Sequence, residues 1–326
     1  MRTNDAIHLG LMLFAFAAAY LVPFELLLLA YVVLGPAHYC TEISWLHDRS
    51  YFLPHRGIAA ALAILAIGAA LIDNPSWFGF AMWAALVACT MLAATTSAAE
   101  GTLIFMVAIA LSAIMVSSGS SLAVIGILIP TLIHVSLFTL VFMTLGAWRS
   151  GSRVQALLVA VYLVAIAVIL LVPPTAEIRI ASFAQAATGY FGNVGPALSR
   201  LLGIPGLKLD TRLTSLLAFV YTYHYLNWFI KADVIRWADI SRGRLALVIA
   251  ASAGSTALYF YDYAFGFTFL LALSLVHILL EFPLDALALR QLGAAAATGL
   301  RGNTATAAKA RSGLARTNSS RRTKRS

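Results

Sequence analysis

Charged residues are scarce in this chain. They make up only 11% of its 326 residues, whereas 61% of the residues are hydrophobic. A soluble globular domain is usually about 25% charged and about 45–50% apolar. This composition excludes an ordinary soluble domain and predicts an all-α fold, a polytopic transmembrane helical bundle.

Cysteine is scarce too, since Cys40 and Cys89 are the only two and both lie in apolar stretches. Such a pair excludes a disulfide framework and any metal site that needs Cys–Cys spacing. The His-x-x-His-His boxes of membrane desaturases and hydroxylases are absent. We also find no internal repeat of the kind on which many transporters are built.

What the chain does contain is a series of long apolar runs. A run of about 20 residues is long enough to cross the roughly 30 Å hydrocarbon layer of a bilayer as a helix. We count ten runs, near residues 6–21, 23–46, 57–73, 77–95, 102–118, 121–147, 154–173, 213–231, 244–261 and 264–284. The first is interpreted as an uncleaved span rather than a signal peptide. Together they predict a transmembrane domain over residues 1–292.

Two other segments complete the predicted organisation. Residues 174–212 are rich in proline and glycine and predict an outer loop with interfacial pieces. Residues 293–326 are rich in Ala, Gly, Ser and Thr and end in a basic run, which predicts a disordered, basic cytoplasmic tail.

Charge also predicts how the chain sits in a membrane. With ten spans, Lys and Arg concentrate on the side that carries both termini, so the positive-inside rule predicts an N-in, C-in topology. We attribute the net charge of +9 to this orientation and to anionic lipids, not to nucleic acid. The expected location is a membrane of the bacterial inner-membrane type, crossed many times.

One stretch in the second run combines helix-breaking residues with ionisable ones. Gly35-Pro36 predicts a kink or break, because proline removes a backbone donor and disfavours the α conformation of the preceding residue. His38 and Glu42 follow, and their four-residue spacing puts them on one face of a helix. Ionisable groups at membrane depth usually face the protein interior or a cavity, and they usually have a function.

Other spans carry histidines at a similar depth. At about 1.5 Å of rise per residue, four histidines lie at the bilayer midplane or on its inner side: His38, His134, His224 and His277. Imidazole is a common ligand of Fe, Zn and Cu, and one shared ion would satisfy a nitrogen of each ring. We therefore predict a metal site, with Glu42 and Glu281 as acids that complete the coordination or act in catalysis.

Proline and aromatic residues surround these histidines. Pro130 lies one turn before His134 and predicts a second kink, while Pro283 follows Glu281 and predicts the end of that helix segment. The eighth run is rich in aromatic and polar side chains that could line a substrate path: Tyr223, Tyr225, Asn227 and Trp228.

The stretch around His38 resembles a motif of the membrane carotene-cleaving dioxygenases of the Brp/Blh type. Gly35-Pro36-Ala37-His38-Tyr39-Cys40-Thr41-Glu42 is similar to that family's Gly-x-x-His-Gly-x-x-Asp stretch, and residues 221–228 are similar to its aromatic-rich helix. The resemblance implies a polytopic fold with one iron held by four histidines, and an iron-ligand role for His38 and His224. Tyr39, Glu42 and Trp228 stand where the family has Gly, Asp and His.

These observations predict a metal-dependent membrane enzyme. Fe(II) is the first choice because His-rich sites with open positions suit oxygen chemistry, and Zn with a general base is the second. A site in the membrane implies a lipophilic substrate such as an isoprenoid, a carotenoid or an acyl lipid. Two alternatives remain open: a proton-coupled transporter that uses membrane-embedded His and Glu, and a structural protein without catalysis.

Overall fold

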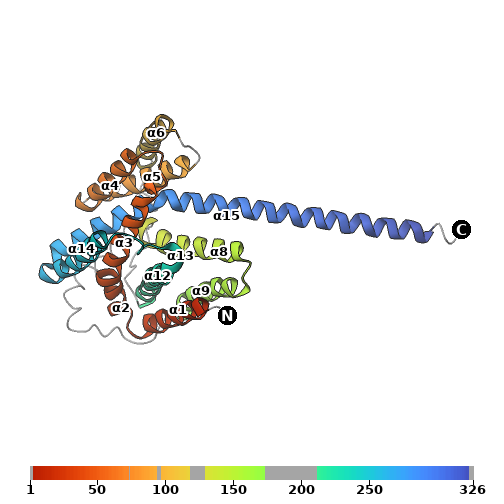
Figure 1. Ribbon diagram of the computed structural model, residues 1–326, viewed down its shortest axis with the longest axis horizontal. Helices are drawn as coiled ribbons and strands as arrows, with labels where there is room; N and C mark the ends of the chain where they lie inside the picture. The colour runs from red at the N-terminus through yellow and green to blue at the C-terminus, as the bar shows by residue number, and fades with distance from the viewer. Residues whose placement is uncertain (1–2, 73, 94–96, 118–128, 173–210, 323–326) are drawn as a thin grey trace.

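A computed structural model describes residues 3–72, 74–93, 97–117, 129–172 and 211–322, and every regular element among them is a helix (Figure 1). The α-helices are α1 (Thr3–Leu21), α2 (Pro23–Leu29), α3 (Gly35–Asp48), α4 (Arg56–Leu71), α5 (Pro75–Leu92), α6 (Ala98–Ser117), α8 (Thr139–Ser150), α9 (Arg153–Leu171), α12 (Thr211–Ile230), α13 (Ala232–Ile235), α14 (Arg242–Tyr261) and α15 (Tyr263–Arg322). Two π-helical segments, η1 (Ala30–Leu34) and η3 (Ile129–Phe138), and one 3₁₀ turn, η2 (Ser50–Phe52), complete them.

Five described helices are long and apolar enough to cross a membrane: Pro23–Asp48, Leu132–Ser150, Arg153–Leu171, Arg242–Tyr261 and Tyr263–Thr298. Four shorter apolar helices cover Asp5–Leu21, Arg56–Leu71, Ser76–Leu92 and Ala98–Ile114. These nine segments match nine of the ten apolar runs that the sequence predicts, and part of the run at 121–147 lies outside the described residues. The all-helical fold is confirmed for the described residues, with five helices that could cross a membrane, and the count of ten spans stays a prediction.

The remaining run corresponds to α12, which belongs to neither group. Its sequence is rich in Tyr, Thr and other polar residues, and more than half of its side chains are buried inside the protein. A helix surrounded by other helices does not have to be apolar toward lipid, because its polar side chains can be satisfied by protein. α12 is therefore the central helix of its part of the bundle.

The second span stays helical through Gly35-Pro36. Residues Ala30–Leu34 form a π-helical turn between α2 and α3, and Gly35 keeps a right-handed helical conformation. A π segment takes the place of the predicted break, and the hydroxyl of Thr256 donates at 2.8 Å to the Val32 carbonyl oxygen, which the missing N–H of Pro36 leaves without its helical donor. The π-helix η3 contains both Pro130 and His134, so a π-helical segment again occurs beside a proline and a histidine.

The prediction that Pro283 ends a helix segment is wrong. Pro283 lies inside α15, which continues without interruption to Arg322. Figure 1 shows α15 leaving the bundle and projecting far beyond it. A proline inside a long helix removes one hydrogen bond and can bend the helix without ending it.

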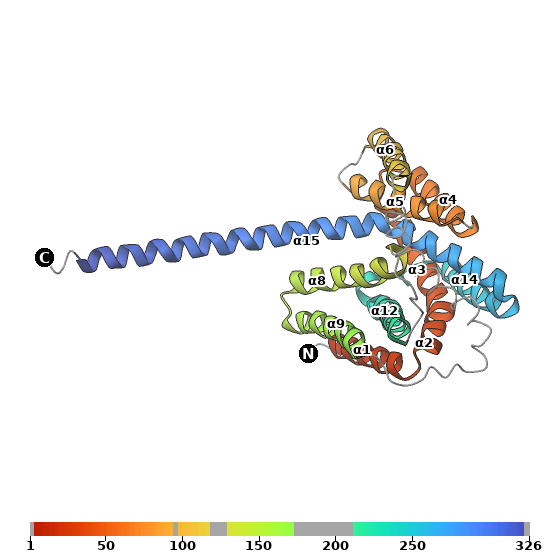
Figure 2. The same cartoon turned by 180° about the vertical axis from the view of Figure 1, so that it is seen from behind.

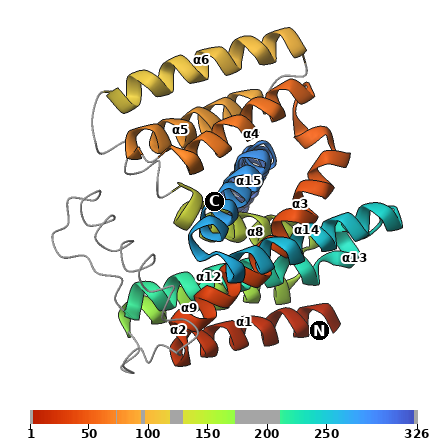
Figure 3. The same cartoon turned by 90° about the vertical axis from the view of Figure 1, so that its left-hand side faces the viewer.

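The bundle is divided by its apolar cores. One core joins α4, α5 and α6 to the part of α15 inside the bundle, and another joins α1, α9 and α12. Figures 2 and 3 show α4–α6 on one side and α1 with α9 on the other, with α3, α14 and the start of α15 between them. The segments that carry the four histidines meet in this middle region.

Large aliphatic side chains cover the outside of the bundle. Leu21, Ile64, Leu103 and Leu171 are between 66% and 79% exposed, and further exposed apolar residues occur on α9 and α14. Water would disfavour so much exposed hydrocarbon, whereas lipid chains solvate it. This surface agrees with the membrane character of the helices.

The two flanking segments have different outcomes. Most of the predicted outer loop at 174–212 lies outside the described residues, and its last two residues already belong to α12. Helix α15 extends through the segment from residue 293 to Arg322, where alanine, the strongest helix former, is common. The disordered, cytoplasmic tail expected there stays a prediction.

Gly266, in the first turn of α15, is a position that we expect to be sensitive to substitution, because α14 approaches it closely. A Cβ at Gly266 would lie 2.3 Å from Cα of Tyr259, a backbone atom that cannot rotate away. We expect Gly266→Ala to destabilise the protein by about 1–3 kcal/mol. Thermal unfolding in detergent measures this, with Gly254→Ala as the control because no heavy atom lies within 4 Å of its added Cβ. Equal melting temperatures for the two variants would contradict the expectation.

Candidate metal centre

His38 lies on α3 directly after the π-helical turn and is 1% exposed. Its Nε2 atom is 3.0 Å from Oε2 of Glu42, which lies one turn further along the helix and is also 1% exposed. The expected one-face arrangement of the two residues is therefore present. Close packing at the start of α3 fixes their helix, because Gly35 leaves room only for the Tyr39 hydroxyl, 2.9 Å from where a Cβ would be.

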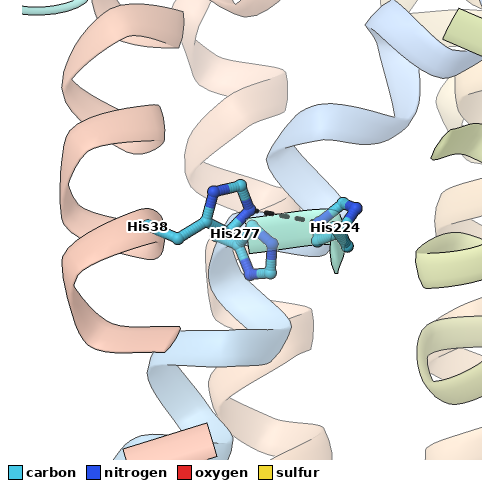
Figure 4. Close-up of side chains that lie close together, drawn as sticks. All are labelled: His38, His224 and His277. Atoms are coloured by element: carbon cyan, nitrogen blue, oxygen red, sulfur yellow. Dashed lines mark hydrogen bonds between the residues drawn. The ribbon is translucent and has the colours of Figure 1, made fainter. Parts of the chain in front are cut away.

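His224 approaches His38 from α12. The Nε2 atoms of the two rings are 3.2 Å apart, as Figure 4 shows. On the other side of the ring, Nδ1 of His224 is hydrogen-bonded to Oγ1 of Thr139 at 2.8 Å. That bond engages Nδ1 and directs Nε2 toward His38.

The spacing of these two nitrogens suits a shared ion. Ligand nitrogens about 2.1 Å from one metal, at angles between octahedral and tetrahedral, are about 3.0–3.4 Å apart. The observed 3.2 Å between Nε2 of His38 and Nε2 of His224 falls in this range.

α15 contributes three ionisable residues at four-residue intervals: His277, Glu281 and Asp285. Nδ1 of His277 donates a hydrogen bond to the carbonyl oxygen of Ser274 at 2.5 Å. A neutral ring that donates from Nδ1 carries its lone pair on Nε2. Nε2 of His277 has no hydrogen-bond partner, so it is free to bind a ligand.

His134 in η3 faces two of these residues from the opposite side. Its Nε2 is 3.4 Å from Oε2 of Glu281, and its Nδ1 is 3.5 Å from Oδ2 of Asp285. Neither nitrogen makes a hydrogen bond of good geometry, although the ring is completely buried. A buried imidazole without partners is costly unless another group satisfies it.

The four predicted histidines thus come together from four segments of the chain. Ring centroids are 4.9 Å apart for His38 and His224, and 5.2 Å for His38 and His277. His134 lies 5.4 Å from His224 and 5.5 Å from His277. Their donor atoms form two groups, within each of which all atoms lie within 4.8 Å of one another: His38 with His224 and His277, and His134 with His277 and Glu281.

Charge in this cluster is unbalanced. The carboxyl groups of Glu42, Glu281 and Asp285 are at most 4% exposed, and those of Glu42 and Glu281 lie close to each other. In the described ranges no lysine or arginine forms an ion pair with any of the three. Buried carboxylates need a cation, or else protons, to compensate their charge.

Aromatic side chains close the cluster. The ring of Tyr39 stacks on His277 at 4.3 Å, and its hydroxyl is hydrogen-bonded to that of Tyr225 at 2.6 Å. The ring of Trp228 lies 5.4 Å from His38, and its Nε1 donates to Oγ1 of Thr41 at 3.0 Å. These side chains separate the imidazoles from their surroundings.

The four residues expected to line a substrate path have different positions. Tyr225 and Trp228 border His38, as described above. Tyr223 instead packs against Tyr162 and Phe219 in the core formed with α1 and α9, so it faces away from the cluster. Asn227 is buried and has an unpartnered Oδ1, but it makes no described contact with a histidine.

Sequence reasoning missed Asp285, Thr139 and Ser274. The helix end predicted at Pro283 leaves Asp285 outside the last span, whereas the continuation of α15 past Pro283 buries it completely beside His134. The four-residue step from Glu281 was the available signal. Thr139 and Ser274 carried none, because small polar residues are common in membrane helices.

Comparison with protein-family models, curated proteins and solved structures finds no match to this chain. The resemblance to the carotene-cleaving dioxygenases remains a prediction.

We expect that removal of the Tyr39 hydroxyl lowers the free energy of unfolding. Tyr39→Phe leaves the buried Tyr225 hydroxyl without its described partner, which costs about 1–3 kcal/mol. The double variant Tyr39→Phe, Tyr225→Phe removes both hydroxyls and recovers part of the loss. Thermal unfolding of the three proteins in detergent measures this coupling. Additive losses would show that the two hydroxyls do not interact.

Proposed function

We propose that the protein is a metal-dependent integral membrane enzyme, a non-haem iron oxygenase that acts on a lipophilic substrate. The observation that carries the proposal is the convergence of four buried imidazoles and three buried carboxyl groups without a lysine or arginine ion pair among the described residues. A divalent cation would satisfy the free nitrogens and compensate the negative charge together.

The donor set favours iron over zinc. Imidazole and carboxylate ligands with open positions are typical of non-haem Fe(II) oxygenases, and an iron there would supply oxygen activation. Zinc is the second choice, and it would make the protein a hydrolase in which Glu42 or Glu281 acts as general base toward water. Identification of the bound metal by elemental analysis distinguishes the iron oxygenase from the zinc hydrolase.

The protein's own residues would have three tasks. His38, His224 and His277 would hold the ion, and hydrogen bonds to Thr139 and Ser274 orient the rings of His224 and His277. Tyr39, Tyr225 and Trp228 would exclude water from the reacting groups. Glu42, 3.0 Å from His38, is the group placed to accept or return a proton.

A groove beside the site supports a lipophilic substrate. It has a volume of about 580 Å³, lies between α3 and α14, and is lined by Ala37 and Thr41, the neighbours of His38 on α3. The hydroxyls of Ser252 and Thr256 in its wall are hydrogen-bonded to backbone carbonyls, so the wall offers little to a polar ligand. The volume is in the range of small-molecule pockets. We propose that a hydrocarbon chain enters there from the lipid.

The membrane arrangement belongs to the same proposal. We propose ten crossings with both termini inside, in a membrane of the bacterial inner-membrane type. The positive-inside rule supports it, because Arg49 and Lys231 directly follow helices, and Arg149 lies in the last turn of α8, at ends expected on one side. The basic tail would then attract anionic lipids of the same face.

A proton-coupled transporter is the second candidate. The observation in its favour is the chain of carboxyl groups formed by Glu42, Glu281 and Asp285, which could pass protons through the bundle interior. A transporter would bind no stoichiometric metal, and Glu42→Gln would abolish proton-coupled uptake.

Metal analysis of detergent-purified protein tests the proposal. We expect stoichiometric iron, or zinc, in the wild type and only background metal in the variant His38→Ala, His224→Ala, because two adjacent ligands are lost. The matched control, His47→Ala with His55→Ala, removes two histidines outside the cluster and should retain the metal. If the wild type binds neither iron nor zinc after reconstitution, the proposal of a metal-dependent enzyme is refuted.

A further inference from the structure

The four histidines do not close on one point. Ligand atoms about 2.1 Å from one ion are at most about 4.2 Å apart, even on opposite sides of it. The donor atoms of His134 do not join those of His38 and His224 in one group even at a limit of 4.8 Å. A single ion could therefore not bind all four imidazoles in this arrangement.

His277 is shared by the two groups, but it can serve only one ion. Its Nδ1 donates to the Ser274 carbonyl, which leaves Nε2 as the one free nitrogen. If Nε2 of His277 binds the same ion as His38 and His224, only His134 and Glu281 remain as ligands in the second group. Their facing atoms, Nε2 and Oε2, are 3.4 Å apart and both lack a hydrogen-bond partner.

Glu42 lies between the two groups. Its Oε2 is 3.0 Å from Nε2 of His38 on one side, and the carboxyl group of Glu281 lies close to it on the other. A carboxylate has two oxygens and can bind a different ion with each. In two-metal sites the ions are about 3.5–4 Å apart, a distance that a carboxylate can bridge.

We propose that the cluster is a two-metal centre. His38, His224 and His277 bind the first divalent cation, His134 and Glu281 bind the second, and Glu42 bridges them. This inference rests on the proposed function, which needs only the first ion. It adds a second cation site whose ligands are an imidazole and carboxylates, a set suited to Fe, Mn or Zn.

Asp285 is a positioning residue in this arrangement. Its Oδ2 lies 3.5 Å from Nδ1 of His134, on the side of the ring opposite Glu281. A carboxylate behind a metal-binding histidine orients the ring and selects the tautomer whose other nitrogen faces the metal. Asp285 would therefore act on the second ion through His134.

The test is a titration of full-length, metal-free protein with Mn(II), followed by metal analysis and electron paramagnetic resonance. We expect two Mn(II) per chain in the wild type and the spectrum of a magnetically coupled pair, because the ions are close. Glu281→Gln and His134→Gln should each reduce binding to one Mn(II) per chain and give an isolated-ion spectrum. Asp285→Asn should weaken only the second binding step, by about 10–100-fold.

Asp48→Asn is the matched control, because it removes an acid of α3 that pairs with Arg244 away from the cluster. Two ions should still bind to this variant. One ion per chain in the wild type, unchanged by Glu281→Gln, would overturn the second site and leave the proposed function intact. No bound ion in the wild type, with either Mn(II) or Fe(II), would overturn both. Size-exclusion chromatography of both variants at His134 and Glu281 identifies any loss that comes from misfolding.

Discussion

Ionisable side chains buried far from water have to be satisfied by protein or by an ion, and this constraint governs the middle of the bundle. Each histidine of the cluster arrives from a different segment, and two have one ring nitrogen occupied: Thr139 engages His224 and Ser274 engages His277. The opposite nitrogens face inward, toward carboxyl groups that have no lysine or arginine ion pair among the described residues. A buried region lined by nitrogen lone pairs and carboxyl groups therefore favours the binding of a cation.

Much of this arrangement follows from simple counting along the sequence. The ends of the apolar runs fix the depth of His38, His134, His224 and His277, and equal depth in one bundle allows them to meet. The structure likewise places His38 and Glu42 on one helical face, as their four-residue spacing predicts. Helix period and bilayer thickness are sufficient for these conclusions.

The finer details could not be read from the sequence. The division of the donors into two groups depends on ring rotation, and Ser274 sets which nitrogen of His277 is free. Tyr223 and Tyr225 are two residues apart on α12, so they face different sides, but only the packing of α1 and α9 decides which side is core. Asp285 was missed because Pro283 suggested a helix end where the helix continues.

The π-helical turn η1 has a consequence for how this site tolerates change. If Ala30–Leu34 were rewound as an ordinary α-helix with all five residues retained, everything after it would rotate by about 100° relative to α2, because a π turn holds one residue more than an α turn. With α2 held against α12, His38 and Glu42 would turn away from the other imidazoles. A one-residue deletion within Ala30–Leu34 would be absorbed by rewinding the π turn, whereas a one-residue deletion in the α-helical residues between this turn and His38 would dismantle the centre while leaving the hydrophobic length of the span nearly unchanged. Hydropathy alone would not reveal the damage.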